Sequence, residues 1–169
     1  EACEVVTSLR DEDRTTVDGR YYQLADAPME PKATGPLPLL IGSSGPKRMA
    51  ALVARWADEW NTWGTPEVFA EKGAHVTRAL EEAGRDPATL ARSTQALVFL
   101  GPDGAATAER FAAIRPAIGG TPEQLVDVVG RYAEAGVDEL IFPDFTFGPQ
   151  AQALETIDQL AREVVDVVR

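Results

Sequence analysis

Cysteine and histidine are almost absent from this sequence: Cys3 and His75 are the only ones among 169 residues. A single cysteine excludes an internal disulfide, argues against zinc or iron–sulfur sites built on cysteine, and favours the cytoplasm as the location. A single histidine leaves one candidate base for a Ser-His-Asp triad. His75 falls in the middle of an expected helix, where we expect a surface side chain, and we expect no metal site.

Basic residues and long apolar runs are also few. The 16 Lys and Arg residues stand against 27 Asp and Glu residues, for a net charge of −11. This acidity argues against binding to nucleic acid or to an anionic membrane through a basic surface. No apolar run approaches the roughly 20 residues that span a bilayer. With 44% hydrophobic and 25% charged residues, the sequence is typical of a globular protein, and we expect one domain over residues 1–169.

The first residues carry a helical pattern that starts without a capping residue, with Val5, Val6 and Leu9 on one face. This is expected either for a piece of a longer protein or for a frayed terminal helix. Asp18-Gly19, between β-forming residues, then predicts a two-residue hairpin turn. Four prolines between positions 28 and 38 predict an extended connector.

Short apolar strands alternate with amphipathic helices from Leu39 onward. Thr65 is the expected cap of one helix, and Thr121 with Gln124 forms a capping box at another. The expected strands are 39–41, 58–64, 94–100 and 137–143, and the helices begin near 46, 66, 105, 122 and 150. This alternation predicts an α/β protein of parallel βα units, either an open doubly wound sheet or part of a (β/α)8 barrel.

Apolar residues at helical spacing predict which helix faces are buried. One stripe is Phe69, Val76, Leu80 and Ala83; that of the last helix is Leu154, Ile157, Leu160, Ala161, Val164 and Val168.

A glycine- and serine-rich segment, Gly42-Ser43-Ser44-Gly45, joins the first of these strands to its helix, with Pro46 expected in the first turn. At such a junction, unpaired amides and the helix dipole stabilise an anion, and glycine lets the backbone approach it closely. The segment is neither a Walker A loop nor a dinucleotide-binding glycine motif. It therefore predicts either a phosphate cradle or a tight turn.

Aromatic and polar residues follow two of the expected strands at the edge where parallel α/β proteins bind ligands. Trp60, Asn61 and Trp63 are candidates for the wall of a pocket that takes a flat ring, with packing as the alternative role of the tryptophans. Asp144 follows the last strand and is a candidate general base or ligand contact, or a solvated loop residue.

Three blocks of the sequence together resemble the C-terminal half of luciferase-like monooxygenases. The blocks are "TTVDGRYYQLADAPMEPK", "PLPLLIGSSGPKRMAALVARWADEWNTWG" and "GTPEQLVDVVGRYAEAGVDELIF", and they occur in the family's order. The nearest branch is that of deazaflavin-dependent oxidoreductases. The resemblance implies a (β/α)8 TIM barrel, of which this chain supplies the second half, about four βα units, while the N-terminal half is absent.

The resemblance also implies a cofactor and a role for the glycine-serine loop. The expected cofactor is coenzyme F-420, an 8-hydroxy-5-deazaflavin, with FMN as the second choice. The cofactor's phosphate would be held by Gly42, Ser43, Ser44 and Gly45, and its ring or the substrate would face Trp60, Asn61 and Trp63. The implied reaction is hydride transfer or monooxygenation on a small organic substrate. We assign no catalytic residue, because much of the ring-binding wall would come from the absent half.

Two other functions remain open at this point. An isolated half barrel exposes strand edges and inner faces, so the chain is expected either to form a homodimer or to pair through that surface, without catalysis of its own. A barrel enzyme acting on a sugar phosphate is the third hypothesis, although many barrels hold phosphate after strands seven and eight.

Overall fold

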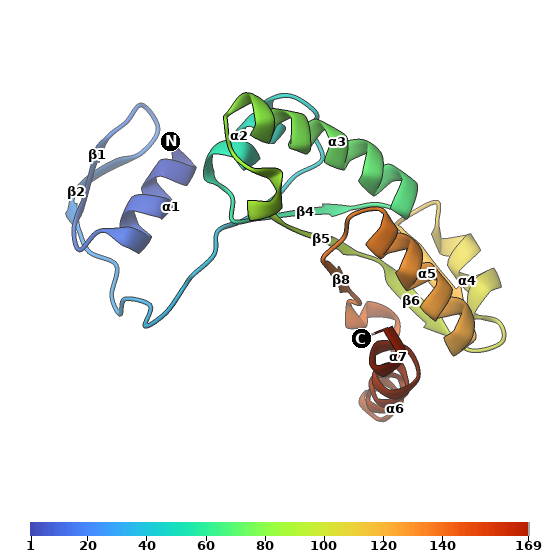
Figure 1. Cartoon of the computed structure of the whole chain (residues 1–169). Helices are drawn as coiled ribbons and strands as arrows, with labels where there is room; N and C mark the ends of the chain where they lie inside the picture. The colour runs from blue at the N-terminus through green and yellow to red at the C-terminus, as the bar shows by residue number, and fades with distance from the viewer. Residues whose placement is uncertain (169) are drawn as a thin grey trace.

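The central sheet has four parallel strands in sequential order, β3 (Leu40–Gly42), β4 (Glu59–Trp63), β5 (Ala91–Gln95) and β8 (Glu139–Ile141), in a computed structural model that describes residues 1–168. The helices α2 (Arg48–Trp56) and α3 (Pro66–Glu82) follow β3 and β4 and lie on the same side of the sheet (Figure 1). Parallel strands that neighbour one another in chain order, with helices packed on one face, are the arrangement found in half of a (β/α)8 barrel. The expected fold class is confirmed.

The strand expected over residues 94–100 is wrong as a single element. The Ala96 amide donates to the Ile141 carbonyl of β8, whereas the Leu97 amide donates to the Pro116 carbonyl. The hydrogen-bonding partner therefore changes within one residue. As a result β5 stays in the central sheet, while β6 (Leu97–Leu100) leaves it and pairs in parallel with β7 (Ala117–Gly120).

The sequence analysis missed β7, and glycine explains why. Its residues, Ala117-Ile118-Gly119-Gly120, have little intrinsic preference for a strand. A Cβ atom on Gly119 would lie 2.2 Å from the Gly104 carbonyl oxygen at the start of α4 (Gly104–Phe111). Glycine is thus required for the close approach of helix and strand, and that demand is visible only in three dimensions.

Two buried clusters hold the half barrel together. The first lies between β4 and the helices α2 and α3 and contains Val53, Trp60, Phe69 and Leu80. The second joins β6 and β7 to α5 (Pro122–Glu134) and to the last helix, and contains Val98, Ile118, Leu125, Tyr132, Leu160 and Val164. Phe69, Val76 and Leu80 are buried as expected, whereas Ala83 is exposed at the end of α3.

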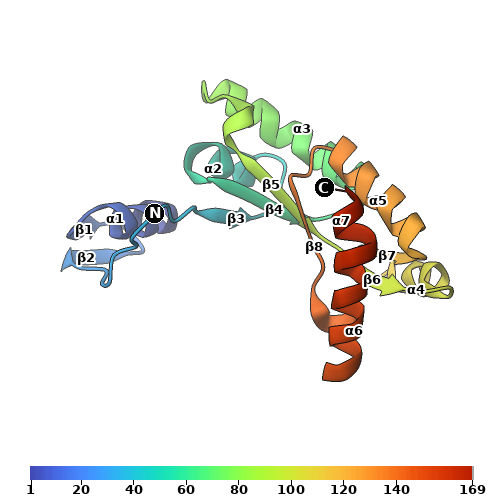
Figure 2. The ribbon, with the colours of Figure 1, turned by 60° about the horizontal axis from the view of Figure 1, so that its bottom comes forward.

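The last helix runs as α6 (Gln150–Leu160), a π-helical segment (Ala161–Val165) and α7 (Asp166–Val168). Its predicted apolar stripe is only partly right: Leu154 is 60% exposed and Ile157 is 48% exposed. The first turns of α6 project beyond the other elements (Figure 2), in keeping with the exposure of these side chains. Ala161 and Val168 are exposed as well. No helix within residues 1–168 is both long and apolar enough to span a bilayer.

An N-terminal unit lies apart from the sheet (Figures 1 and 2) and contains α1 (Ala2–Asp11), β1 (Thr15–Asp18) and β2 (Gln23–Ala27). The hairpin is confirmed, but the two-residue turn is wrong, because Asp18 pairs with Gln23 and four residues lie between them. The Glu1 carboxylate explains the longer turn: it accepts hydrogen bonds from the amides of residues 20, 21 and 22. The proline-rich connector after β2 contains no helix or strand before β3.

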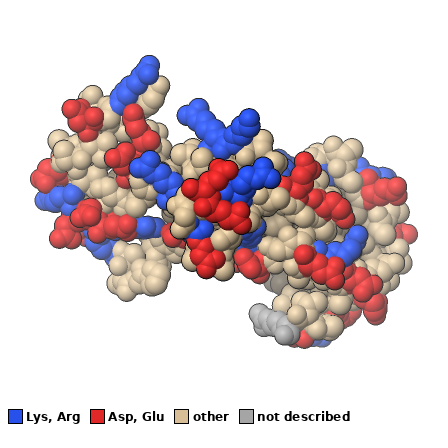
Figure 3. All heavy atoms as spheres, turned by 45° about the horizontal axis from the view of Figure 1, so that its top comes forward, with Lys and Arg blue, Asp and Glu red and all other residues tan. Residues whose placement is uncertain are grey.

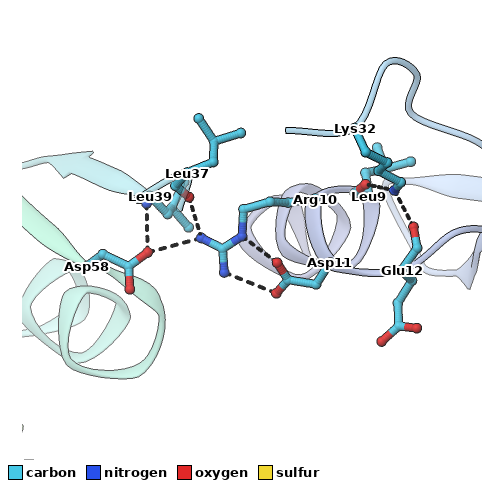
Figure 4. A network of polar contacts seen from close by, with 8 residues as sticks. All are labelled: Leu9, Arg10, Asp11, Glu12, Lys32, Leu37, Leu39 and Asp58. Carbon is cyan, nitrogen blue, oxygen red and sulfur yellow. Dashed lines mark hydrogen bonds and ion pairs between the residues drawn. The ribbon is translucent and has the colours of Figure 1, made fainter. Parts of the chain in front are cut away.

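Arg10 is the main polar link between this unit and the sheet (Figure 4). Its guanidinium donates to the Leu37 carbonyl and to Asp58, both at 3.0 Å, and it also pairs with Asp11. Asp58 in turn accepts from the Leu39 amide at 2.7 Å. Hydrogen bonds from Arg10 lower the pKa of Asp11. Because Leu39 and Asp58 directly precede β3 and β4, this link lies at the N-terminal edge of the sheet, opposite the edge where barrels bind ligands.

Candidate functional site

A hollow of about 420 Å³ opens at the C-terminal edge of the sheet, where β3 and β4 end. It is lined by Gly42, Ser43, Ser44, Asn61, Thr62, Trp63 and Lys72. Five of the residues singled out in the sequence therefore meet here: Gly42, Ser43, Ser44, Asn61 and Trp63. Gly45, Trp60 and Asp144 lie outside the lining.

The glycine-serine loop differs from the expected strand-to-helix junction. The Ser43 amide donates to the Asn61 carbonyl at 2.9 Å and thereby extends the pairing of β3 with β4. Helix α2 begins only at Arg48, so Pro46 precedes its first turn, contrary to the prediction. Among residues 1–168, the amides of Ser44 and Gly45 donate no hydrogen bond, and both remain available as donors. The loop's capacity for an anion thus rests on these amides and on the serine hydroxyls rather than on a helix dipole.

The two glycines of this loop have different surroundings. A Cβ atom on Gly42 would meet no atom of residues 1–168 within 4 Å, so the backbone there is open to close approach by a ligand. A Cβ on Gly45 would lie 3.3 Å from Met49, on the helix side of the loop. Gly42 is therefore the better placed of the two for contact with an anion.

Trp60 lies on the helix side of β4 and packs against Phe69, with 5.1 Å between ring centroids. Its side chain is only 1% exposed, so it does not wall the hollow. Its indole Nε1–H donates to the carbonyl and the hydroxyl oxygen of Ser43, both at 3.2 Å. Trp60 therefore acts on the hollow indirectly, by holding the loop in place.

Trp63 is the tryptophan that does line the hollow. The guanidinium of Arg115, from the segment between α4 and β7, lies 4.9 Å from the centre of the Trp63 ring, a cation–π contact. Asp144 begins a short 3₁₀ helix (Asp144–Thr146) after β8 and is exposed. The structure thus brings Trp63 to the site and leaves Asp144 outside it.

Lys72 is a site residue that the sequence analysis missed. It extends from α3, and its ammonium group donates to the Trp63 carbonyl at 3.2 Å and to the Thr62 hydroxyl at 3.5 Å. This places a cation on the hollow that Ser43 and Ser44 also line, in a chain whose net charge is −11. Figure 3 shows acidic and basic side chains interspersed over the face drawn. The sequence signal that could have identified Lys72 is its position in the second turn of a helix that directly follows a strand.

Tyr132 fixes the turn that leads out of β4. Its hydroxyl donates to the Gly64 carbonyl at 3.0 Å, between α5 and the residue that follows Trp63. The side chain is buried, and burial raises the pKa of Tyr132 to about 12, because the phenolate would lose its hydration. Tyr132 therefore stays protonated and keeps donating over the whole physiological pH range.

A chain of hydrogen-bonded polar side chains crosses the opposite face of β4 and β5, which is the interior face of a closed barrel. Gln95 donates to Asn61 at 3.0 Å, Asn61 donates to Ser93 at 2.8 Å, and Ser93 donates to Glu59 at 2.5 Å. Ser93 and Asn61 are 1% and 7% exposed. The sequence analysis singled out only Asn61, because the other three become neighbours through strand register.

The family model for luciferase-like monooxygenases matches residues 1–119. The chain belongs to this family. The family resemblance stated from the three sequence blocks is confirmed.

Relatives within and around the luciferase-like monooxygenase family match nearly the whole chain. An F420-dependent hydroxymycolic acid dehydrogenase of Mycobacterium tuberculosis is 26% identical over 149 residues, which are 88% of this chain and 41% of that protein. A solved F420-dependent secondary alcohol dehydrogenase, in complex with an F420-acetone adduct, superimposes with a TM-score of 0.79 at 21% identity. The coenzyme F420-dependent tetrahydromethanopterin reductase from Methanopyrus kandleri gives a TM-score of 0.78 at 15% identity.

The coverage of these relatives is partial in one direction only. The two solved structures match 99% and 98% of this chain, whereas the chain covers 60% and 61% of theirs. At these identities the structural matches establish the fold. The chain thus spans about half of the relatives it matches, and its sheet corresponds to one half of their barrel.

Proposed function

We propose that this chain supplies the C-terminal half of the barrel in an oxidoreductase that uses coenzyme F-420, with FMN as the second choice. The observation that carries the proposal is the hollow at the C-terminal edge, where Ser43, Ser44 and Lys72 converge. The relatives of the chain include F420-dependent dehydrogenases, which supports the choice of cofactor. The reaction proposed for the whole enzyme is hydride transfer or monooxygenation on a small organic substrate, in the cytoplasm.

The residues of the hollow fit the phosphate of such a cofactor. The serine hydroxyls and the amides of Ser44 and Gly45 are donors, and Lys72 supplies a positive charge. Gly42 leaves room for the anion to approach the backbone. Trp63 offers an aromatic surface on the same hollow, which suits a flat ring.

The cofactor, when bound, carries the hydride or reacts with oxygen, and the chain's own residues bind and orient it. Lys72 and the loop would anchor the phosphate end, and Trp60 and Tyr132 would hold the two segments that form the hollow. In this proposal the first half of the relatives' barrel closes the ring pocket. The 169-residue chain alone is then expected to bind a phosphate group weakly and to have no catalytic activity.

Binding of FMN and riboflavin to the natural protein that carries this sequence tests the phosphate site, because riboflavin lacks the phosphate. In calorimetry, coenzyme F-420 or FMN is expected to bind at micromolar concentration or tighter, and riboflavin more weakly. Lys72→Met is expected to weaken FMN about tenfold, about 1.4 kcal/mol, and to leave riboflavin within twofold. Absence of micromolar binding by both phosphorylated cofactors would overturn the proposal.

Lys47→Met is the matched control for that experiment. Lys47 lies in the same loop region and carries the same charge, but it does not line the hollow. Its substitution should leave FMN affinity within twofold. Equal losses in the two variants would mean that overall charge, rather than a built site, attracts the cofactor.

We also propose, as the second function, that the half barrel pairs with another copy through its open surfaces. The exposed Leu154 and Ile157 on α6 favour it, because apolar side chains side by side on a helix gain from burial. Sedimentation of the 169-residue chain tests this: a dimer is expected, and a stable, folded monomer at high concentration would count against it.

A further inference from the structure

Glu59 is an ionisable residue for which the fold offers no cation. It is half-buried at the start of β4, and among residues 1–168 its carboxylate forms no ion pair. Burying a charge without a countercharge is costly unless hydrogen bonds compensate it. Here the donor is the Ser93 hydroxyl, at 2.5 Å. The arrangement calls for an explanation beyond stability.

The carboxylate sets the direction of every hydrogen bond beyond it. A carboxylate only accepts, so Ser93 must donate to it and can only accept from its other neighbour. Asn61 must then turn its amide nitrogen toward Ser93 and its carbonyl oxygen toward Gln95. Gln95 must then donate from its own amide nitrogen to the Asn61 carbonyl oxygen. With Asn61 and Ser93 buried, water does not compete, and aligned bonds of this kind reinforce one another.

The series of hydrogen bonds from Glu59 to Gln95 ends at the edge of the sheet that carries the hollow. Gln95 is the last residue of β5 and lies opposite Trp63, which lines the hollow. Because the nitrogen end of its amide faces Asn61, which uses one of its two N–H donors, the carbonyl oxygen points away from Asn61, and among residues 1–168 this oxygen accepts no hydrogen bond. The hydrogen-bonded side chains therefore fix which way round the Gln95 amide lies and present its carbonyl oxygen as an acceptor next to the aromatic wall.

We propose that Glu59 is a positioning residue that, through Ser93 and Asn61, turns the Gln95 carbonyl toward the ligand, so that the site selects a ring carrying a hydrogen-bond donor at that place. This inference rests on the proposed function. Flavins and deazaflavins share such a donor, the imide N3–H of their pyrimidine edge. The Gln95 carbonyl accepts from this N–H, while Lys72 and the glycine-serine loop hold the phosphate.

NMR of the ligand-free protein tests the relay itself. Glu59→Gln places a group that both donates and accepts where only an acceptor stood, so the fixed direction is lost. We expect the side-chain amide signals of Asn61 and Gln95 to shift. Glu139→Gln is the matched control. Glu139 lies opposite Ser93 in register and on the same face, yet it is not part of the series of hydrogen bonds that runs from Glu59 to Gln95. If the Gln95 signals move no more in Glu59→Gln than in Glu139→Gln, the inference is wrong, whether or not a cofactor binds.

Binding of FMN and N3-methylated FMN tests the selection of the ligand. The unmodified protein should prefer FMN about tenfold, and Glu59→Gln should reduce the preference to threefold or less, whereas Glu139→Gln should keep it. Shifted NMR signals with an unchanged preference would overturn the role in ligand selection. Failure of the unmodified protein to bind any of these cofactors would instead overturn the proposed function, and the NMR result would still decide the relay.

Discussion

The two faces of β4 carry the same kinds of residue in different surroundings. On the helix side, Trp60 is buried against Phe69, and on the interior side, Trp63 lines the hollow three residues later. The helix side is covered by α2 and α3, which pack an apolar cluster against it. The interior side carries Asn61 and Glu59, joined to β5 by hydrogen bonds.

This difference separates stability from ligand recognition within one strand. Side chains of a strand alternate between faces, so adjacent residues answer to different demands. The helix side gains free energy by burying apolar area. On the interior side, the hydrogen bonds between β4 and β5 orient side chains toward the site. Substitutions of neighbouring residues should therefore have effects of different kinds.

The largest expected effect is that of Trp60→Ala. Truncation leaves a cavity between β4 and α3, and we expect the free energy of unfolding to fall by about 3–5 kcal/mol. Trp63→Ala, on the half-buried interior side, should lower the free energy of unfolding by only about 1 kcal/mol, and its main effect should be weaker binding of the ring. Urea denaturation measures the loss of unfolding free energy in both variants. Equal losses for the two tryptophans would contradict the contrast between the faces.

The next effect, Ser93→Ala, breaks the polar chain at its centre. The Asn61 nitrogen and the Glu59 carboxylate lose their shared partner, and we expect a loss of about 2 kcal/mol in unfolding free energy. Thr94→Val is the control on the other face. Thr94 donates to the Thr62 carbonyl at 2.6 Å, and a carbonyl oxygen keeps a second lone pair for the sheet, so about 1 kcal/mol is expected. If Thr94→Val lowered the unfolding free energy more than Ser93→Ala, the polar side chains from Glu59 to Gln95 would not act as a coupled unit.

Local signals predicted the helices well. The capping box of Thr121 and Gln124 and the cap at Thr65 are confirmed, because each depends on residues only three positions apart. Trp60 and Trp63 show the limit of such signals. Both were candidates for the wall of the pocket, with packing as the alternative, but they lie on opposite faces of β4, and which face packs against helices depends on Phe69 and its neighbours.

Contacts between distant segments account for what was missed. The break between β5 and β6 depends on two carbonyls, of Ile141 and Pro116, that lie far along the chain. The polar chain depends on the register that sets Asn61 opposite Ser93. Neither follows from periodicity, since the same residues in another register would not meet.

The smallest expected effect, Tyr132→Phe, tests the buried polar contact at the turn that follows β4. Loss of the hydrogen bond to the Gly64 carbonyl should cost about 1 kcal/mol of unfolding free energy at neutral pH.

The pKa of Tyr132 is raised to about 12 in the folded protein, against about 10 in the unfolded chain. Its contribution is therefore complete below pH 10 and is lost as the pH rises toward 12. Urea denaturation between pH 8 and 11.5 should show a steeper loss for the unmodified protein than for Tyr132→Phe. Tyr21→Phe, at an exposed tyrosine, is the control and should follow the unmodified protein. If Tyr132→Phe instead kept the full alkaline loss, the burial of this hydroxyl would not be its cause.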